Sequence, residues 1–564
     1  MGKTSFLYLI IYSTFTAGLF CQNLQLKIKG HTAVETTTID SLNYIKNHNN
    51  YLSIKSEVDS LQKNLYKVGY IENELKYINK LNDSVYSAEI HLRKKYSSIS
   101  IYYDKSLISP KLLNSVSKKV FDHYFTIPFS ELENTLNFIN AKISEKGYPF
   151  SKLYLLNIEV DGKSNLKANL IVDSTNQKRV ISDIIIKGYD KFPRSYLKHY
   201  LKIKTNQTFN LNVIKIKTEQ LNNLKFASEI KSPEVLFSND STTLYLYLQK
   251  TKSNSFDGFL GFGTNEDTNK LQFDGYLNLN LTNNLNYGES FKLLYKSDEN
   301  DQKTFETNLS LPYLFQSPIG LDFALRIFKR DSSFTTVNQN AKIHYQINAK
   351  HKIYSGISST QSSNLLNEIT TSTILDYKTT YYTFAYQFLK NQSFNLLFPI
   401  NSQLYFESNF GKRNQSNQQE KQSLLSLDAF KIFKLDIKNS IYLRVNGAAL
   451  NSNTYFENEL IRFGGINSIR GFEENSIYAT LLGVLNTEYR FQLNNSIYIH
   501  SITDLAYFEN NISSTEEKLF GVGFGFGILT KTGLLKFNYA NGKTENTPFK
   551  LSNSKIHLSL LANF

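Results

Sequence analysis

The hydrophobic pattern divides the chain into two regions. Up to about Lys250, short alternating apolar runs are mixed with segments of helical spacing, whereas from Phe256 onward apolar and polar residues alternate with a period of two. A period of two is typical of β-strands, and a period of 3.6 is typical of amphipathic helices. The pattern therefore predicts an α+β region at residues 22–252 and an all-β region at residues 256–564.

The α+β region repeats itself. Gly69-Tyr70, Gly147-Tyr148 and Phe226 each end a helical stretch, and the aromatic positions 70, 148 and 226 are 78 residues apart in both intervals. Equal intervals predict duplicated units, which we place at residues 22–97, 98–177 and 178–252. Each unit should contain a strand, two helices and two further strands. The alternative, three unrelated α+β domains, would leave the equal intervals unexplained.

Two of the expected first strands end alike. Leu26-Lys-Ile-Lys-Gly30 and Ile184-Ile-Ile-Lys-Gly188 both close on a glycine. We expect these glycines to adopt a backbone angle that other residues avoid.

The all-β region consists of about sixteen alternating segments of roughly ten residues, separated by clusters of Asn, Ser, Gly and Asp. Bacterial outer-membrane barrels have even strand numbers and strands of this length. The predicted fold is therefore a set of α+β repeats followed by an all-β, 16-stranded antiparallel transmembrane β-barrel. A soluble β-sandwich is the alternative, but Ile556–Phe564 forms an alternating last strand with a terminal aromatic residue. Such a last strand favours a barrel, whose closure leaves no unpaired edge in hydrocarbon.

One segment carries glycine at every second position. In Leu519–Ile528, Gly521, Gly523, Gly525 and Gly527 share one face, and the other face carries Phe520, Val522, Phe524, Phe526 and Ile528. We expect the apolar face to contact lipid and the glycine face to leave room in the lumen for a group that packs against the wall.

Composition excludes several protein classes. Mean hydropathy is −0.34 and no stretch after the N-terminus is long and apolar enough for a spanning helix, so a helical transporter is excluded. A single cysteine rules out a disulfide framework, a cysteine zinc site and an iron–sulfur cluster. The net charge of +14 is spread along the chain, which gives no nucleic-acid patch. The sequence contains no nucleotide, metal or nucleophile motif, so we expect no enzyme activity, no cofactor and no metal.

The N-terminus has the layout of a secretory signal. Lys3 precedes an apolar run that reaches about Phe20, and we assign residues 1–21 to a signal peptide. Cleavage after Cys21 would leave a mature chain without cysteine. In the alternative reading, Cys21 is the lipidated first residue of a lipoprotein.

A short motif connects the chain to a family. Ile469-Arg470-Gly471-Phe472, in the long loop expected after the eleventh barrel strand, resembles the V-R-G-F/Y motif of the BamA/TamA superfamily of outer-membrane proteins. Thr487–Phe491 is similar to that family's E-x-R segment. The three repeats resemble POTRA domains, and three of them before one barrel are most similar to the layout of TamA.

The resemblance implies an arginine site inside the barrel. In the family, the loop folds into the lumen and its arginine pairs with acids on the wall. The matching acids here are Asp504 and Glu488. Ala506 departs from the pattern, because the family usually has glycine there. In the alternative reading, Arg470 lies in a solvated loop.

The resemblance also implies a function. Members insert proteins into the bacterial outer membrane, with periplasmic POTRA units receiving unfolded clients, or a periplasmic or inner-membrane partner, on open sheet edges. A lateral gate between the first and last barrel strands would template insertion into the surrounding lipid. The expected gate residues are Gly258, Gly261, Gly263, Leu558, Leu560 and Phe564. Close packing is the alternative role for the glycines, and protein export through the barrel or lipid handling is the alternative function.

Overall fold

The computed structural model describes residues 24–173, 177–264, 271–297, 302–366, 373–392, 395–416, 418–530, 533–551 and 554–562. The signal-peptide residues 1–21, including Cys21, and the terminal Phe564 lie outside the described residues. The chain forms two compact units. The first holds two small sheets, and the second holds a third small sheet together with a large sheet.

The first small sheet has the strand order β2-β1-β4-β3. Its elements are β1 (Leu24–Gly30), α2 (Ala33–Ser41), β2 (Asn47–His48), α3 (Tyr51–Lys67), β3 (Glu74–Lys80) and β4 (Val85–His91). The first and last strands are parallel, and β3 pairs antiparallel with β4 at the edge. Leu26 and Ile28 of β1 alternate inward and meet Ile54 and Leu61 of α3 in a buried core, as the alternation predicts.

The other two small sheets share this plan. The second contains β5 (Ser98–Tyr102), α4 (Pro110–Leu113), β6 (Lys119–Val120), β7 (Tyr124–Pro128), η1 (Phe129–Glu131), α5 (Leu132–Glu145), β8 (Lys152–Asp161) and β9 (Asn165–Asp173). The third contains β10 (Asp183–Lys187), the π-helix η2 (Tyr196–Tyr200), α6 (Leu211–Thr218), η3 (Glu219–Asn223), β11 (Ala227–Phe237) and β12 (Thr242–Lys250). In each, the first strand runs parallel to the last and the preceding strand pairs antiparallel with the last.

The second sheet departs from the expected unit. The hairpin β6–β7 extends the sheet beyond β5, so the unit has five strands rather than three. Only the four-residue α4 stands in place of a full first helix.

The two terminal glycines of the first strands differ. Gly188 has φ +88°, as expected of a position that favours glycine. The same expectation for Gly30 is wrong, because Gly30 is not among the residues with positive φ. A Cβ at Gly30 would lie 2.3 Å from Cβ of Glu35, so close approach to α2, not backbone angle, requires glycine.

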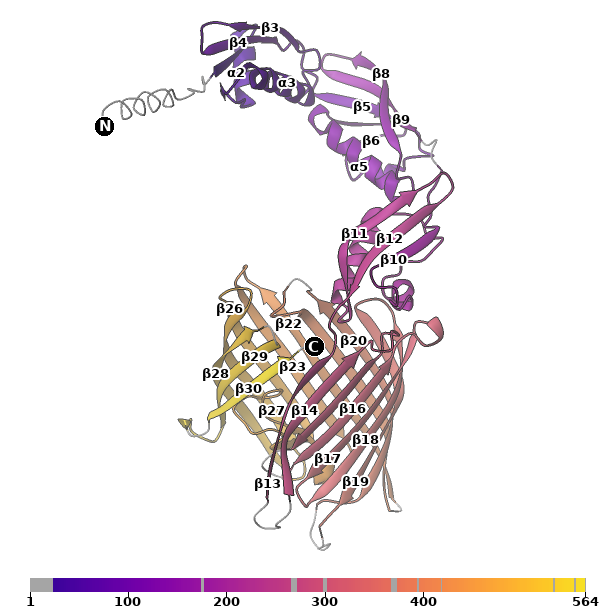
Figure 1. Ribbon diagram of the computed structural model, residues 1–564, viewed down its shortest axis with the longest axis vertical. Helices are drawn as coiled ribbons and strands as arrows, with labels where there is room; N and C mark the ends of the chain where they lie inside the picture. Colours follow the sequence, from indigo (N-terminus) through magenta and orange to yellow (C-terminus); the bar gives the residue numbers. More distant parts are fainter. Residues whose placement is uncertain are drawn as a thin grey trace, which may run out of the picture. The chain divides into compact units, whose positions relative to one another are not determined.

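The large sheet has sixteen antiparallel strands, which confirms the predicted fold class (Figure 1). They are β13 (Ser255–Thr264), β14 (Leu271–Thr282), β15 (Ser290–Ser297), β16 (Lys303–Leu311), β17 (Ile319–Arg330), β18 (Phe334–Gln346), β19 (His351–Asn364), β20 (Tyr377–Asn391), β21 (Ile400–Gln415), β22 (Gln418–Lys434), β23 (Asn439–Asn451), β26 (Leu481–Gln492), β27 (Ile497–Asn510), β28 (Thr515–Leu529), β29 (Gly533–Thr544) and β30 (Ser554–Ala562). Each strand pairs with the next in chain order.

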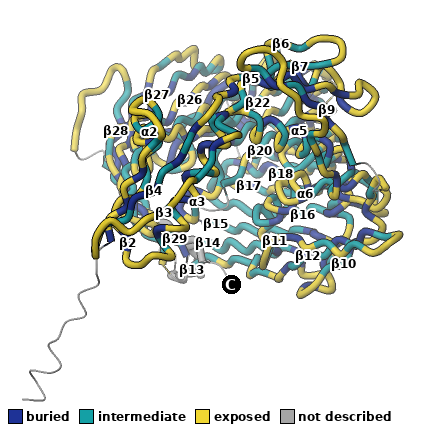
Figure 2. Tube along the Cα trace, turned by 90° about the horizontal axis from the view of Figure 1, so that it is seen from above, coloured by how far each residue is buried: buried dark blue, intermediate teal, exposed yellow. Residues whose placement is uncertain are grey.

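Many barrel-wall residues are only partly buried. Every residue of β16 is of intermediate exposure, and much of the wall is teal in Figure 2. Such exposure on both faces suits a sheet with lipid on one side and a wide lumen on the other. No helix in the described part of the chain is long and apolar enough to cross a membrane.

The first and last strands meet at a seam. Some Cα atoms of β13 and β30 approach within 8 Å. Yet no ladder joins the two strands over the described residues 255–264 and 554–562, whereas every other neighbouring pair is laddered. The seam is therefore the one interruption in the hydrogen bonding of the described wall.

Candidate functional site: the loop inside the barrel

The longest described connection between barrel strands joins β23 to β26. We call residues 452–480 the lumen loop. It contains η5 (Glu457–Glu459) and a small hairpin of β24 (Ile461–Phe463) and β25 (Ile477–Ala479). It follows the eleventh strand of the barrel, as the sequence predicts. Its residues bond to strands all around the wall, from Lys296 of β15 to Lys555 of β30, which means that the loop spans the interior.

The tip of the lumen loop is held by one arginine. The backbone N–H and Nε of Arg470 donate to Oδ2 of Asp504 at 3.0 and 2.8 Å, and Nη2 donates to Oδ1 at 2.6 Å. Nη1 donates to Glu488, whose other oxygen accepts from Nε of Arg490 at 2.7 Å. Asp504 is 0% exposed and Arg470 is 5% exposed. We call Arg470, Asp504 and Glu488 the tip anchor.

The strands explain why these acids meet the arginine. Asp504 on β27 and Asn486 on β26 are paired in register, and residues two apart on a strand point to the same side, so Glu488 also faces inward. Leu505 on the opposite face is 42% exposed. The structure thus brings together the three residues that the family resemblance pairs.

Glycines let the tip lie directly on the wall. A Cβ at Gly521 of β28 would lie 2.3 Å from the carbonyl oxygen of Arg470. A Cβ at Gly471, which has φ +91°, would lie 2.4 Å from the backbone nitrogen of Gly542 in β29. The expected room beside the glycine face of β28 is therefore filled by the loop backbone at Gly521. The role of Gly542 was not predicted, since β29 shows no glycine alternation.

Apolar contacts surround the tip anchor. Ile469 is fully buried in a cluster with Phe463, Val484, Phe508 and Leu519. Ala506, which replaces the family's usual glycine, belongs to the same cluster. Its methyl group packs in the cluster, and the pairing of Arg470 with Asp504 is formed beside it. Phe472 packs against the cluster from the edge.

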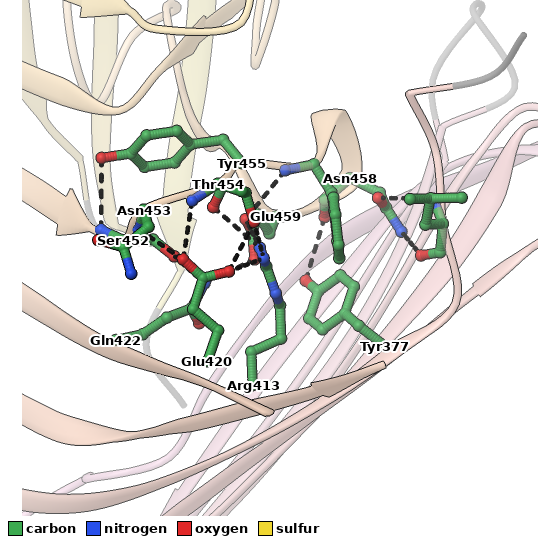
Figure 3. Close-up of polar contacts among 12 residues, drawn as sticks. Tyr377, Arg413, Glu420, Gln422, Ser452, Asn453, Thr454, Tyr455, Asn458 and Glu459 are labelled. Carbon is green, nitrogen blue, oxygen red and sulfur yellow. Dashed lines mark hydrogen bonds and ion pairs between the residues drawn. The ribbon is translucent and has the colours of Figure 1, made fainter. Parts of the chain in front are cut away.

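A second arginine holds the root of the lumen loop (Figure 3). Nη2 of Arg413 on β21 donates to Glu420 of β22 and to the hydroxyl of Thr454, both at 2.5 Å. Nη1 donates to Glu459 and to the carbonyl of Thr454. The guanidinium carbon lies 3.7 Å from the ring centroid of Phe456. Arg413 is 3% exposed. We call Arg413, Glu420 and Glu459 the root anchor.

Further polar contacts fix the same end of the loop. Oε1 of Glu420 accepts from Ser452 Oγ at 2.9 Å and from the backbone N–H groups of Asn453 and Thr454 at 2.5 and 2.8 Å. Tyr377 donates its hydroxyl to the carbonyl of Asn458. The root therefore bonds to β20, β21 and β22, while the tip bonds to β26 and β27.

The root anchor was missed at the level of sequence. Arg413 and Glu420 are paired in register across the hairpin that joins β21 to β22. A two-residue turn between Gln415 and Gln418 would have placed them side by side. Their approach to Thr454 and Glu459, more than thirty residues away, has no sequence signal that we can identify.

The third small sheet is fastened to the barrel turns. Tyr196 donates to the carbonyl of Gly288 at 3.1 Å, and His199 bonds to the carbonyl of Gln316 at 2.7 Å. Tyr196 also packs edge-on against Tyr313, with ring centroids 4.7 Å apart. Burial raises the pKa of Tyr200, beside them, to about 12. These contacts, which sequence reasoning did not find, hold the last small domain against the barrel rim.

The expected gate residues lie along the seam. Gly258 is in β13, and a Cβ there would lie 2.6 Å from the carbonyl oxygen of Tyr276 on the neighbouring strand. That contact is the close packing considered as the alternative. Leu558 in β30 is 68% exposed. Gly261, Gly263 and Leu560 lie in the same two strands, and Phe564 lies outside the described residues.

Comparisons with known proteins agree with this architecture. Residues 180–249 match the family described as POTRA, surface antigen variable number repeat. No curated protein matches the sequence. Two solved structures, CdiB from Acinetobacter baumannii and CdiB from Escherichia coli, are similar at TM-scores of 0.53 and 0.52, with 15% and 13% identity. They cover 83% and 90% of this chain, and 90% and 98% of their own.

A third structure, BamA from Haemophilus ducreyi lacking POTRA domains 1–3, has 15% identity and a TM-score of 0.49, covering 83% of this chain and all of its own. The matched residues make the third small domain a POTRA domain, and the first two share its strand topology. The chain has the fold of the two CdiB structures.

Proposed function

We propose that this chain, whose loop motif resembles that of the BamA/TamA superfamily, inserts barrel proteins into the bacterial outer membrane. In this proposal the three POTRA-like domains lie in the periplasm and receive unfolded clients, and the seam between β13 and β30 serves as a lateral gate. No catalytic group takes part. The free energy of insertion comes from burial of the client's apolar face in lipid and from closure of its strand ladder.

The observation that carries the proposal is the contrast between lumen and seam. The lumen is crossed by a loop that buried ion pairs hold at both ends, Arg470 at the tip and Arg413 at the root. Removing one partner of a buried ion pair costs about 3–5 kcal/mol, so a route through the lumen requires the loss of strong contacts. A route through the seam requires no ladder bonds to break over the described residues.

The periplasmic domains offer edges for an incoming chain. β8 is an edge strand of the second sheet. Its side chains Tyr154, Leu156, Ile158 and Val160 are each 45–55% exposed. An exposed apolar edge strand can accept a further strand, which adds main-chain hydrogen bonds with little demand on sequence. β8 therefore supports the proposed receipt of unfolded clients.

Two other functions make different demands. Export of one secreted protein would use the lumen, and it would require the lumen loop to leave its anchors. Lipid handling would need neither gate closure nor edge strands. The doubly held loop favours insertion over export.

A reversible disulfide crosslink between β13 and β30 tests the proposal. Cys21 is the only natural cysteine, so a new cysteine pair can be read without interference in a variant that also carries Cys21→Ser. Phe256→Cys, near the start of β13, would be combined in turn with Leu560→Cys or Ala562→Cys, near the end of the antiparallel β30. By alternation, residues 560 and 562 share a face with the exposed Leu558. Each single variant is the matched control. The variants would replace the depleted native chain in its own cell, and outer-membrane proteins, secreted proteins and lipids would be quantified.

We expect the oxidised double variants to lower barrel-protein levels and a reductant to restore them. Two results together would contradict insertion and support export: unchanged levels of outer-membrane barrel proteins when the seam is crosslinked, and loss of one secreted protein after Arg470→Ala. A change in lipid balance alone would replace it by lipid handling.

A further inference from the structure

The first small domain gathers two histidines and a glutamate on one surface. His31 follows β1 directly, and Glu89 and His91 lie two residues apart on β4. Nδ1 of His31 is 3.9 Å from Oε1 of Glu89, and Nε2 of His91 is 2.8 Å from the same oxygen. The three potential ligand atoms all lie within 4.8 Å of one another. The two imidazole centroids are 4.3 Å apart.

Folding alone assembles this cluster. β1 and β4 are parallel neighbours, with Gly30 opposite Ile90 in register. Because Ile90 points into the core, Glu89 and His91 point to the opposite face of the sheet. His31 reaches that face from the end of β1. The expectation of no metal rested on the lack of a local cluster in the sequence, and no local pattern links residue 31 to residues 89 and 91.

The supporting contacts orient the ligands. Tyr77 on β3 donates its hydroxyl to Oε2 of Glu89 at 2.5 Å, which leaves Oε1 facing both histidines. Glu35 accepts from the backbone N–H of His31 at 2.6 Å and of Leu92 at 3.3 Å. It therefore ties together the two segments that carry the ligands. A hydrogen bond to the second carboxylate oxygen is a common outer contact of metal ligands.

The same arrangement explains Gly30. Its α-carbon packs so close to Glu35 that a Cβ would lie 2.3 Å from the Glu35 side chain. Glycine at this position lets Glu35 reach both segments. The glycine that ends β1 thus supports the frame of the cluster.

The geometry points to a binding site for a divalent transition metal of the zinc class, formed by His31, Glu89 and His91. Two imidazoles and a carboxylate suit zinc, nickel or copper rather than magnesium or calcium. Zinc–ligand bonds of about 2.0–2.1 Å place neighbouring ligand atoms roughly 3.3 Å apart in a tetrahedron. The distances of 2.8 and 3.9 Å lie on either side of that separation.

The site is open to solvent on one side. The side chains of His31, Glu89 and His91 are 65%, 25% and 21% exposed. Three protein ligands leave a coordination position free for water or for a side chain of another protein. The inference is independent of the proposed insertion function, because it concerns only the first small domain.

Cobalt absorption tests the inference. The untagged full chain in detergent would be titrated with Co²⁺, which absorbs visibly when held by imidazole and carboxylate ligands, and then with Zn²⁺ in competition. We expect one bound equivalent in the wild-type chain. Loss of an outer contact weakens metal binding by roughly 10–100-fold, and Tyr77→Phe should weaken it about tenfold. His31→Ala and His91→Ala each remove a ligand and should weaken metal binding by more than that range. His123→Ala removes an exposed histidine of the second domain and should change nothing.

A second readout separates ligation from misfolding. Bound Cu²⁺ should show two coupled nitrogens by electron paramagnetic resonance, and one in His31→Ala. Far-ultraviolet circular dichroism would verify the fold of each variant. Equal metal affinity in the wild-type, His31→Ala and His91→Ala chains would overturn the inference, as would Cu²⁺ spectra that do not change.

Discussion

The two ends of the lumen loop are held by arginines in different ways. At the tip, Asp504 is 0% exposed, and every hydrogen bond to its carboxylate that the described residues provide comes from Arg470. At the root, Glu420 also accepts from Ser452, Asn453 and Thr454. Asp504 at the tip depends on one side chain, whereas both acids of the root keep other donors. Loss of one arginine should therefore cost more at the tip than at the root.

The surrounding walls differ as well. The tip lies on Gly521 and Gly542, where main chain meets main chain without intervening side chains. The root lies among side chains, with the Arg413 guanidinium packed over the ring of Phe456. A contact between backbones tolerates no added atoms, because the wall strands are fixed by their ladders. A contact between side chains can adjust its rotamers. The tip should be more sensitive to steric change.

The largest expected effect is that of Arg470→Ala. It leaves Asp504 buried with no other hydrogen-bond donor among the described residues, while Glu488 keeps Arg490. An uncompensated buried charge costs about 3–5 kcal/mol. The loop tip should detach, and the free energy of unfolding in lipid vesicles should fall by that amount. A protease added to the folded chain should cut the loop in the variant and spare it in the wild-type chain. Arg470→Lys keeps the charge but lacks the fork that grips Asp504 at two oxygens, so it should recover only part of the loss.

Arg413→Ala should have the second largest effect. The variant loses the pairs with Glu420 and Glu459, but Glu420 retains the donors from residues 452–454. We expect the free energy of unfolding in lipid vesicles to fall by about 1.5–3 kcal/mol, the range for hydrogen bonds to charged groups. A loss as large as that of Arg470→Ala would show that the two anchors contribute equally to stability.

A glycine pair tests the steric difference. A Cβ at Gly521 meets the Arg470 carbonyl at 2.3 Å, whereas a Cβ at Gly483 on β26 has no neighbour within 4 Å. Gly521→Val should displace the tip and destabilise the barrel by about 1–3 kcal/mol, as overpacking does. Gly483→Val should leave stability and loop protection unchanged. Equal effects of the two valines would mean that strand propensity, not contact with the loop, decides the result.

Sequence reasoning reached the tip and not the root for a physical reason. The tip residues form a short contiguous motif, Ile469–Phe472, and its partners lie on strands whose alternation places Asp504 inward. The sixteen strands follow from the same alternation. The root anchor needs Arg413 to meet Thr454 and Glu459 of the lumen loop, and the cluster of His31 with His91 needs two strands to become neighbours. Such contacts depend on the path of loops in space, which local periodicity does not encode.

The smallest expected effect on the free energy of unfolding is that of Arg444→Ala. Arg444 on β23 holds Asp428 at 2.8 and 3.1 Å and donates to the carbonyl of Asn467, close to the tip. Its pair is more exposed than either anchor, at 20% and 31% for the two side chains. Solvent screening limits such pairs to about 0–1 kcal/mol, so Arg444→Ala should lower the free energy of unfolding only slightly.

The control for this variant is Lys518→Ala. Lys518 and Glu545 form a pair at 3.4 Å with side chains 59% and 52% exposed, and its loss should lie at the lower end of the same range. If Arg444→Ala matches Lys518→Ala and leaves the loop protected from protease, the contact at Asn467 contributes little to holding the tip. If Arg444→Ala releases the loop, the contact at Asn467 is part of the tip anchor. Both ends of the lumen loop would then be held by several polar side chains, and the proposed difference between tip and root would disappear.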